Sequence, residues 1–190
     1  MSSMIVFHES KSLKTEVITE NTVPKPNGFY GDSKLQAENG LKELEDVNFK
    51  VVILRPPMIY GPNCKGNFMK LVWLATVTPV FPAFHNRRSM LYIDNLCEFV
   101  KQVIIHELSG CFYPQNKELA DTVEIVKYFA RAKGHKLFVW KWLNVFVRLG
   151  SPFVQALNKM FASYYYDESI VQVNFEYHVI DEKESFKNIH

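Results

Sequence analysis

The chain has 190 residues, of which 47% are hydrophobic and 22% are charged; these values are close to globular averages and exclude a generally disordered chain. The length suits one domain with a sizeable core and is too short for two complete ones. The formal charge of +2 does not indicate a nucleic-acid or anionic-membrane partner, and no apolar run reaches the ~20 residues of a transmembrane helix.

The first third of the chain carries strand and helix signals in turn. Residues 2–7, SSMIVF, are predicted to form a short buried strand, and a polar loop follows to about residue 28. Helical spacing covers residues 30–45, and the run VVIL at 51–54 indicates a strand buried on both faces, as in a parallel sheet. This order is typical of a doubly wound α/β sheet. The expected apolar face of the helix consists of Leu35, Ala37, Leu41 and Leu44.

The next elements continue the same alternation. A helix is predicted over residues 67–76, a strand over residues 89–93, and a further helix after Asp94, which is expected to cap it. Residues 111–114 favour another strand, and residues 123–132 favour a helix.

Residues 137–149, LFVWKWLNVFVRL, are dense in large apolar side chains. Lys141 and Arg148 accompany them, so the segment could lie on a membrane surface or form an exposed patch that drives association. Apolar stripes usually belong to a core. We therefore expect this segment to pack inside a substrate-binding lobe, and membrane contact is not expected.

The cysteines and histidines form neither a disulfide framework nor a metal site by their spacing. Cys64, Cys97 and Cys111 are odd in number and far apart, which favours a reducing compartment. The first ten residues lack the basic start and long apolar stretch of a signal peptide. The sequence therefore predicts a cytoplasmic protein without a bound metal.

Tyr30 and Lys34 carry the clearest chemical signal. They are four residues apart at the start of a predicted helix, so both side chains lie on one face. A lysine ammonium stabilises a nearby phenolate, which suits a tyrosine that exchanges a proton with a hydroxyl group. Tyr113 and Lys117 repeat the spacing, but Pro114 makes a shared helical face unfavourable. A solvated helix face is the bland alternative for Tyr30 and Lys34.

Several ordered segments resemble the nucleotide-sugar epimerase/dehydratase family of extended short-chain dehydrogenases/reductases. The chain carries four features in the same order as that family. They are a serine-containing stretch, a helix with YxxxK, a strand followed by RPxxxYGP, and an arginine that precedes a helix with Asp at its start. The resemblance implies a Rossmann-like fold of which the chain is the C-terminal part. The segments are SSMIVF, YGDSKLQAE, LRPPMIYGP, RRSMLYIDNL, TVEIVKYFARAKG and YYYDES.

The resemblance assigns a catalytic and cofactor role to five residues. Tyr30 would be the acid/base, and Lys34 would assist it while holding the nicotinamide ribose. Ser3 matches the active-site serine, although it could be merely a strand residue. Pro57 and Met58 would pass beside the nicotinamide.

Two further residues would contact the substrate. Asn67 matches a substrate-contacting asparagine, and Arg88 matches an arginine that binds the diphosphate, with Arg87 as the adjacent candidate. Arginine suits that role because its planar fork forms bidentate, charge-assisted bonds to phosphate oxygens. Asn67 could instead be a helix cap, and the two arginines a solvated pair.

The family's glycine-rich pyrophosphate turn is absent, since no GxGxxG pattern occurs in the sequence. Residues 1–63 are therefore expected to be a remnant of the dinucleotide-binding domain with the active-site helix. Residues 64–190 are expected to be mainly the substrate-binding lobe, with one or two segments that return to the sheet. We expect weak NAD binding by this chain alone, and self-association through the exposed edge of the 2–7 strand.

The implied function is 4-epimerisation of a UDP-sugar with NAD as cofactor. A UDP-4-keto-sugar reductase of the same family, with NADH or NADPH as donor, is the alternative. A non-catalytic remnant or interaction module is the alternative from another class.

Overall fold

The computed structural model describes residues 1–8 and 10–189, and its strands form four parallel pairs. The predicted α/β class with parallel strands is confirmed. The buried run at 51–54 forms one strand of the first of these pairs, and its residues are apolar on both faces. The pairs are β2 (Val52–Leu54) with β6 (Gly110–Phe112), β3 (Met58–Tyr60) with β5 (Met90–Tyr92), β1 (Glu16–Ile18) with β8 (Tyr164–Tyr166), and β4 (Val80–Pro82) with β7 (Phe138–Trp140).

Residues 2–7 are not the predicted strand. The chain runs beside the end of β2 only briefly, where the Ser2 amide donates to the Leu54 carbonyl at 2.7 Å and the Met4 amide to the Pro56 carbonyl at 2.9 Å. It then turns into a 3-10 helix, η1 (Met4–Val6), whose N-cap is Ser3.

The same segment is packed rather than exposed. Ser2, Met4, Val6 and Phe7 are all buried. The expected uncovered strand edge is therefore wrong, and it no longer supports self-association.

The long helices occur close to the predicted bounds. Asp94 lies in the first turn of its helix, where its negative charge interacts favourably with the helix dipole. It is not the predicted cap, because Tyr92 occupies the N-cap position. Asp121 caps the next long helix by accepting a hydrogen bond from the Val123 amide at 2.8 Å. The helices are α1 (Phe29–Lys42), α2 (Asn67–Val77), α3 (Ile93–Ile105), α4 (Thr122–Ala132), α5 (Asn144–Gly150), α6 (Gln155–Phe161) and α7 (Glu182–Lys187), with the 3-10 turns η2 (Lys141–Leu143) and η3 (Glu168–Ile170).

The predicted apolar face of α1 is confirmed at Leu35, which is half-buried against the cluster around Val6 and Phe7, and is wrong at Ala37, Leu41 and Leu44. Leu41 and Leu44 are exposed, whereas Glu38 is buried in the middle of the helix. The inward face of α1 therefore carries a charged group, which pairs with Arg55 next to the end of β2.

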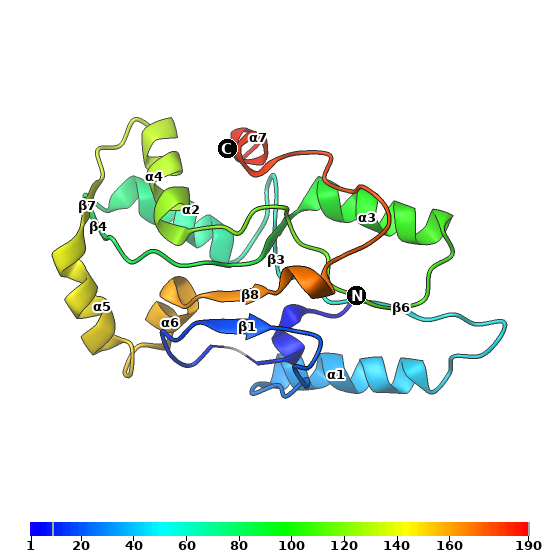
Figure 1. Cartoon of the computed structure of the whole chain (residues 1–190). Coiled ribbons are helices and arrows are strands. Elements are labelled where there is room, and N and C mark those ends of the chain that lie inside the picture. Colours follow the sequence, from blue (N-terminus) through cyan, green and yellow to red (C-terminus); the bar gives the residue numbers. More distant parts are fainter. Residues whose placement is uncertain (9, 190) are drawn as a thin grey trace.

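The largest core cluster joins the strands to α2 and α4. The rings of Tyr60 and Phe68 stack with centroids 4.7 Å apart, and Phe68 meets Phe129 edge-on at 5.9 Å. In Figure 1, α1 lies on one side of β1 and β8, and α2, α3 and α4 lie on the other. No helix of the described residues is long and apolar enough to cross a membrane.

Candidate functional site

Five residues that the sequence singled out line one cavity of about 670 Å³. They come from four separate segments of the chain, namely the N-cap of η1, the β2–β3 connection, the start of α2 and the stretch before β5. In parallel α/β sheets, ligands bind in the crevice beyond the carboxyl ends of the strands. The cavity fits this rule, because it is lined where the chain leaves β2. The five are Ser3, Pro57, Met58, Asn67 and Arg88.

The Arg88 side chain forms a cationic part of the cavity wall. Its Nη1 donates to the Met160 carbonyl at 3.4 Å and also to the Lys159 carbonyl. Burial lowers the pKa of Arg88. The ion pairs found among residues 1–8 and 10–189 do not include Arg88. A guanidinium held by carbonyl groups and without a carboxylate partner suits an anionic ligand.

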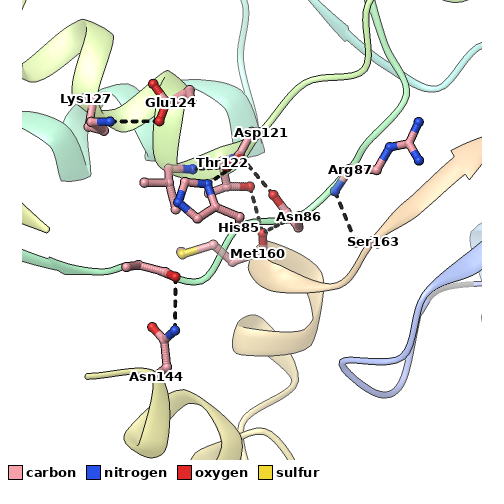
Figure 2. Close-up of polar contacts among 12 residues, drawn as sticks. His85, Asn86, Arg87, Asp121, Thr122, Glu124, Lys127, Asn144, Met160 and Ser163 are labelled. Atoms are coloured by element: carbon pink, nitrogen blue, oxygen red, sulfur yellow. Dashed lines mark hydrogen bonds and ion pairs between the residues drawn. The ribbon is translucent and has the colours of Figure 1, made fainter. Parts of the chain in front are cut away.

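Asn86 fixes the segment that carries Arg88 (Figure 2). Its buried amide Nδ2 donates to the carbonyls of Met160 and Ala162 at 3.0 and 3.1 Å, and its Oδ1 accepts from the Thr122 amide at 2.9 Å. Asn86 was not among the predicted site residues. Its place before the two arginines was the only signal, and a single asparagine gives no indication of burial.

The side chains of Arg87 and Arg88 lie on opposite sides of the chain, because side chains alternate along an extended backbone. Its side chain is exposed, points away from the contacts around Asn86 in Figure 2, and lies 4.8 Å from the centre of the Tyr165 ring. It does not line the cavity. The geometry therefore favours Arg88 over Arg87 as the phosphate-binding candidate.

Tyr30 and Lys34 lie on α1 outside the cavity wall. The Lys34 Nζ is 5.7 Å from the centre of the Tyr30 ring and donates to the Met1 carbonyl at 3.3 Å. The first turn of α1 packs against η1, since a Cβ added at Gly31 would lie 2.7 Å from the Ile5 carbonyl oxygen. This contact brings the Tyr30 segment next to the turn that Ser3 caps.

In the second tyrosine–lysine pair, Tyr113 is part of the packed interior and does not pair with Lys117. Burial raises the pKa of Tyr113 to about 12, and its hydroxyl accepts a hydrogen bond from Arg55 Nη1 at 3.2 Å. Its ring contacts Phe7 and Tyr166, whereas Lys117 is exposed beyond the strand. Tyr113 therefore belongs to a packed cluster, and it shares no helical face with Lys117.

Several polar cavity-lining residues were not predicted from the sequence, among them Lys70, His8 and Tyr164. Lys70 is three residues after Asn67 on α2, so the i, i+3 spacing could have found it. His8 pairs with Glu16 through an Nε2–Oε2 distance of 2.5 Å, and the Tyr164 hydroxyl donates to the His8 carbonyl at 2.9 Å. These contacts join residues that are 8 and 156 positions apart in the sequence, and no local pattern reveals them.

Two residues that the resemblance places beside the nicotinamide of NAD lie in this cavity. Pro57 and Met58 reach the cavity, next to the N-cap serine of η1. The pyrophosphate of a dinucleotide is normally held at a glycine-rich turn between a strand and a helix. The eight glycines of the chain include no such turn.

Residues 1–111 match the family model described as the NAD dependent epimerase/dehydratase family. A UDP-glucose 4-epimerase from Vibrio cholerae is 34% identical over 113 residues, which are 56% of this chain and 34% of that protein. N-acetyl-alpha-D-glucosaminyl-diphospho-ditrans,octacis-undecaprenol 4-epimerase from Escherichia coli O157:H7 is 31% identical over 96 residues, or 48% of this chain and 29% of that protein. The matches thus span about a third of the length of these relatives.

Solved structures show the same fold. UDP-glucuronic acid 4-epimerase from Bacillus cereus, in complex with NAD, superposes with a TM-score of 0.66 at 16% identity, over 99% of this chain and 58% of that one. A hypothetical dTDP-4-dehydrorhamnose reductase from Sulfolobus tokodaii gives 0.63 at 16% identity, over 100% and 61%. The fold is therefore the Rossmann-like fold of sugar-nucleotide epimerases and reductases.

Proposed function

The chain belongs to the NAD dependent epimerase/dehydratase family, and from that premise we propose that it acts in the 4-epimerisation of a UDP-sugar. The observation that carries the proposal is the convergence of Ser3, Met58, Asn67 and Arg88 on one cavity. The cavity volume of about 670 Å³ lies in the range of small-molecule binding sites.

The diphosphate side of the site is built from cations on two elements. Arg88 offers a guanidinium without a carboxylate partner among the described ion pairs, and Lys70 lines the same cavity from α2. Asn67, one turn earlier on that helix, supplies an amide that can bond a sugar or phosphate oxygen. These three groups orient the substrate so that the sugar points toward Ser3.

Proton transfer is assigned to α1. Tyr30 takes the proton of the sugar 4-hydroxyl and returns it after the sugar has turned, and Lys34 stabilises the phenolate. Ser3 holds the 4-oxygen by a hydrogen bond, and Lys34 also binds the nicotinamide ribose. Pro57, Met58 and Lys34 would hold the nicotinamide end of NAD, which would supply hydride transfer at C4 of the sugar.

The two predicted parts of the chain meet at this cavity. Ser3, Pro57 and Met58 belong to residues 1–63, whereas Asn67 and Arg88 belong to residues 64–190. We propose that the first part serves the cofactor side and the second part the substrate side.

A lipid-linked sugar diphosphate is a second candidate substrate. Gln155 and Ala156 line the cavity, and they directly follow Phe153 and Val154, which are exposed by 88% and 47%. An apolar rim of this kind suits a substrate with a polyprenyl chain, such as the one named for the Escherichia coli relative.

A 4-keto-sugar reductase is the alternative reaction, and it would use the same residues for half of the cycle.

The experiment is incubation of the chain with NAD and UDP-glucose or UDP-N-acetylglucosamine, followed by proton NMR of the sugar. Formation of the 4-epimer supports the proposal. Reduction of a supplied UDP-4-keto sugar without epimer formation favours the reductase. Binding of UDP-sugar without turnover indicates a non-catalytic binding protein, and absence of both binding and turnover contradicts the proposal.

A further inference from the structure

The segment from β7 to the start of α6 presents an unusually large number of apolar side chains to solvent. Of its large hydrophobic residues, Val147 is buried at 4%, whereas Phe153 is 88% and Leu149 is 67% exposed. The expectation that this segment packs inside a lobe is therefore wrong. We call its exposed members the aromatic surface: Phe138, Trp140, Trp142, Val145, Phe146, Leu149, Phe153 and Val154.

Four rings of the aromatic surface form one continuous row. Successive centroids are 6.4 Å apart from Phe138 to Trp140, 5.9 Å from Trp140 to Trp142, and 5.6 Å from Trp142 to Phe146. In β7 the exposed Phe138 and Trp140 alternate with the half-buried Val139, so the strand presents the two rings on its outer face.

The backbone beneath these rings is anchored. β7 pairs in parallel with β4, and the Ala83 amide donates to the Trp140 carbonyl at 3.2 Å. The Asn144 Nδ2 donates to the Ala83 carbonyl at 3.0 Å. Figure 2 labels Asn144 and draws this bond as a dashed line. The aromatic surface is thus a preformed feature of the fold.

The charge of this region differs from that of the rest of the chain. Residues 125–166 contain seven of the 22 Lys and Arg residues and none of the 20 Asp and Glu residues. The remaining residues therefore carry 15 basic and 20 acidic side chains. Lys133, Lys136, Lys141 and Arg148 are exposed, and the ion pairs of the described residues do not include them.

We propose that the aromatic surface docks on a membrane that contains anionic lipids. Surfaces that combine tryptophan and phenylalanine with lysine and arginine, and that lack acidic residues, partition into the boundary between lipid headgroups and acyl chains. The basic residues add attraction to a negative surface. The charge pattern disfavours a second copy of this chain, because symmetric contact through the same surface would bring like charges together.

The position in the fold supports this partner. Figure 1 places α5 and β7 at one end of the molecule, away from α1 and the N-terminus. The aromatic surface ends at Val154, directly before α6, whose residues Gln155 and Ala156 line the cavity. A chain docked in this way would hold the cavity close to the lipid surface.

The test is sedimentation of the chain with vesicles made of equal parts phosphatidylglycerol and phosphatidylcholine. We expect binding that weakens as salt rises and is lost with pure phosphatidylcholine. The double variant Lys141→Glu/Arg148→Glu should lower the affinity by about tenfold or more. Trp142→Ser/Phe146→Ser should lower it through loss of inserted rings, and circular dichroism checks that both variants fold.

The matched control is Lys14→Glu/Lys50→Glu, which changes the net charge equally at two exposed lysines outside the region. It should bind anionic vesicles nearly as well as the unaltered chain. The proposal is overturned if the unaltered chain stays in the supernatant, or if the two charge variants lose affinity equally. It is also overturned if Trp142→Ser/Phe146→Ser abolishes a dimer or oligonucleotide binding while vesicle binding persists.

Discussion

The Glu38 carboxylate on α1 and the Arg55 guanidinium after β2 form a bidentate pair in the interior, with 2.6 Å between Oε2 and Nη2 and 3.0 Å between Oε1 and Nε. Both residues are buried, at 3% and 5% exposure. Burial alone would raise the pKa of Glu38, but the hydrogen bonds and the positive charge of Arg55, together with smaller contributions from Ser2 and Lys42, lower it overall. The pair fastens the helix that carries Tyr30 to the strand that leads to Pro57.

The first prediction concerns this pair. Glu38→Ala leaves a buried guanidinium without its partner, so the free energy of unfolding should fall by about 3–5 kcal/mol. Glu38→Leu/Arg55→Met removes both charges and should be the more stable of the two variants. Denaturant unfolding measures both. Equal stability of Glu38→Ala and the unaltered chain would show that the pair does not hold α1 in place.

The second prediction concerns pH. Burial, followed by the charges of Glu118, Asp121 and Asp181, raises the pKa of Glu182 from 4.5 to about 7. Because the folded-state pKa is raised, the carboxyl contributes stability that is fully present below about pH 4.5 and is lost as pH rises through about 7. Glu182→Gln should therefore gain stability relative to the unaltered chain over that interval. Thermal unfolding at both ends of the interval measures this, and a difference that is constant with pH would contradict it.

The third prediction concerns the contact between α1 and η1. Gly31→Ala places a methyl group 2.7 Å from the Ile5 carbonyl oxygen and 2.8 Å from Pro26 Cβ, so the helix must shift and stability should fall. Gly40→Ala is the matched control on the same helix, with nothing within 4 Å of the added Cβ. It should stabilise the chain by up to about 1 kcal/mol through helix propensity. Opposite signs in denaturant unfolding are expected; a stabilising Gly31→Ala would rule out the close contact.

The sequence predicted the regular elements better than their faces. The run at 51–54 and the strand at 89–93 appear as β2 and β5, because a buried parallel strand must be continuously apolar. The strand prediction for residues 2–7 was wrong because a buried 3-10 turn and a buried strand need the same apolar residues. Helical spacing could not reveal that α1 buries Glu38, since its partner Arg55 lies 17 residues away.

Of the residues that the motifs name, five share a cavity, whereas Tyr30 and Lys34 lie outside its wall. Ser3, Pro57, Met58, Asn67 and Arg88 share a cavity, yet sequence spacing could not choose between Arg87 and Arg88. The choice depends on Asn86 and its three hydrogen bonds to distant segments. The aromatic surface was misjudged for the opposite reason, because apolar content alone does not show whether a partner element covers it.

The fourth prediction concerns the proposed acid/base residue. In the 4-epimerisation assay, Tyr30→Phe keeps the ring and removes only the hydroxyl, so the rate should fall by about 10²–10⁴-fold. Affinity for UDP-sugar should change little, because the diphosphate is assigned to Arg88. Tyr113→Phe is the control, since that hydroxyl bonds Arg55 in a packed cluster. Near-full turnover in Tyr30→Phe together with a large loss in Tyr113→Phe would move the active site elsewhere.

The central claim is that this cavity holds a nucleoside diphosphate through Arg88, and calorimetric titration with UDP tests it most directly. The unaltered chain should bind UDP, and Arg88→Ala should weaken binding by about 10–100-fold through loss of charge-assisted hydrogen bonds. Arg88→Lys should recover part of the affinity, since it restores the charge without the planar fork. Arg87→Ala, which removes an equal charge outside the cavity, should bind as the unaltered chain does. Equal losses in Arg87→Ala and Arg88→Ala, or no binding of UDP by the unaltered chain, would contradict the claim.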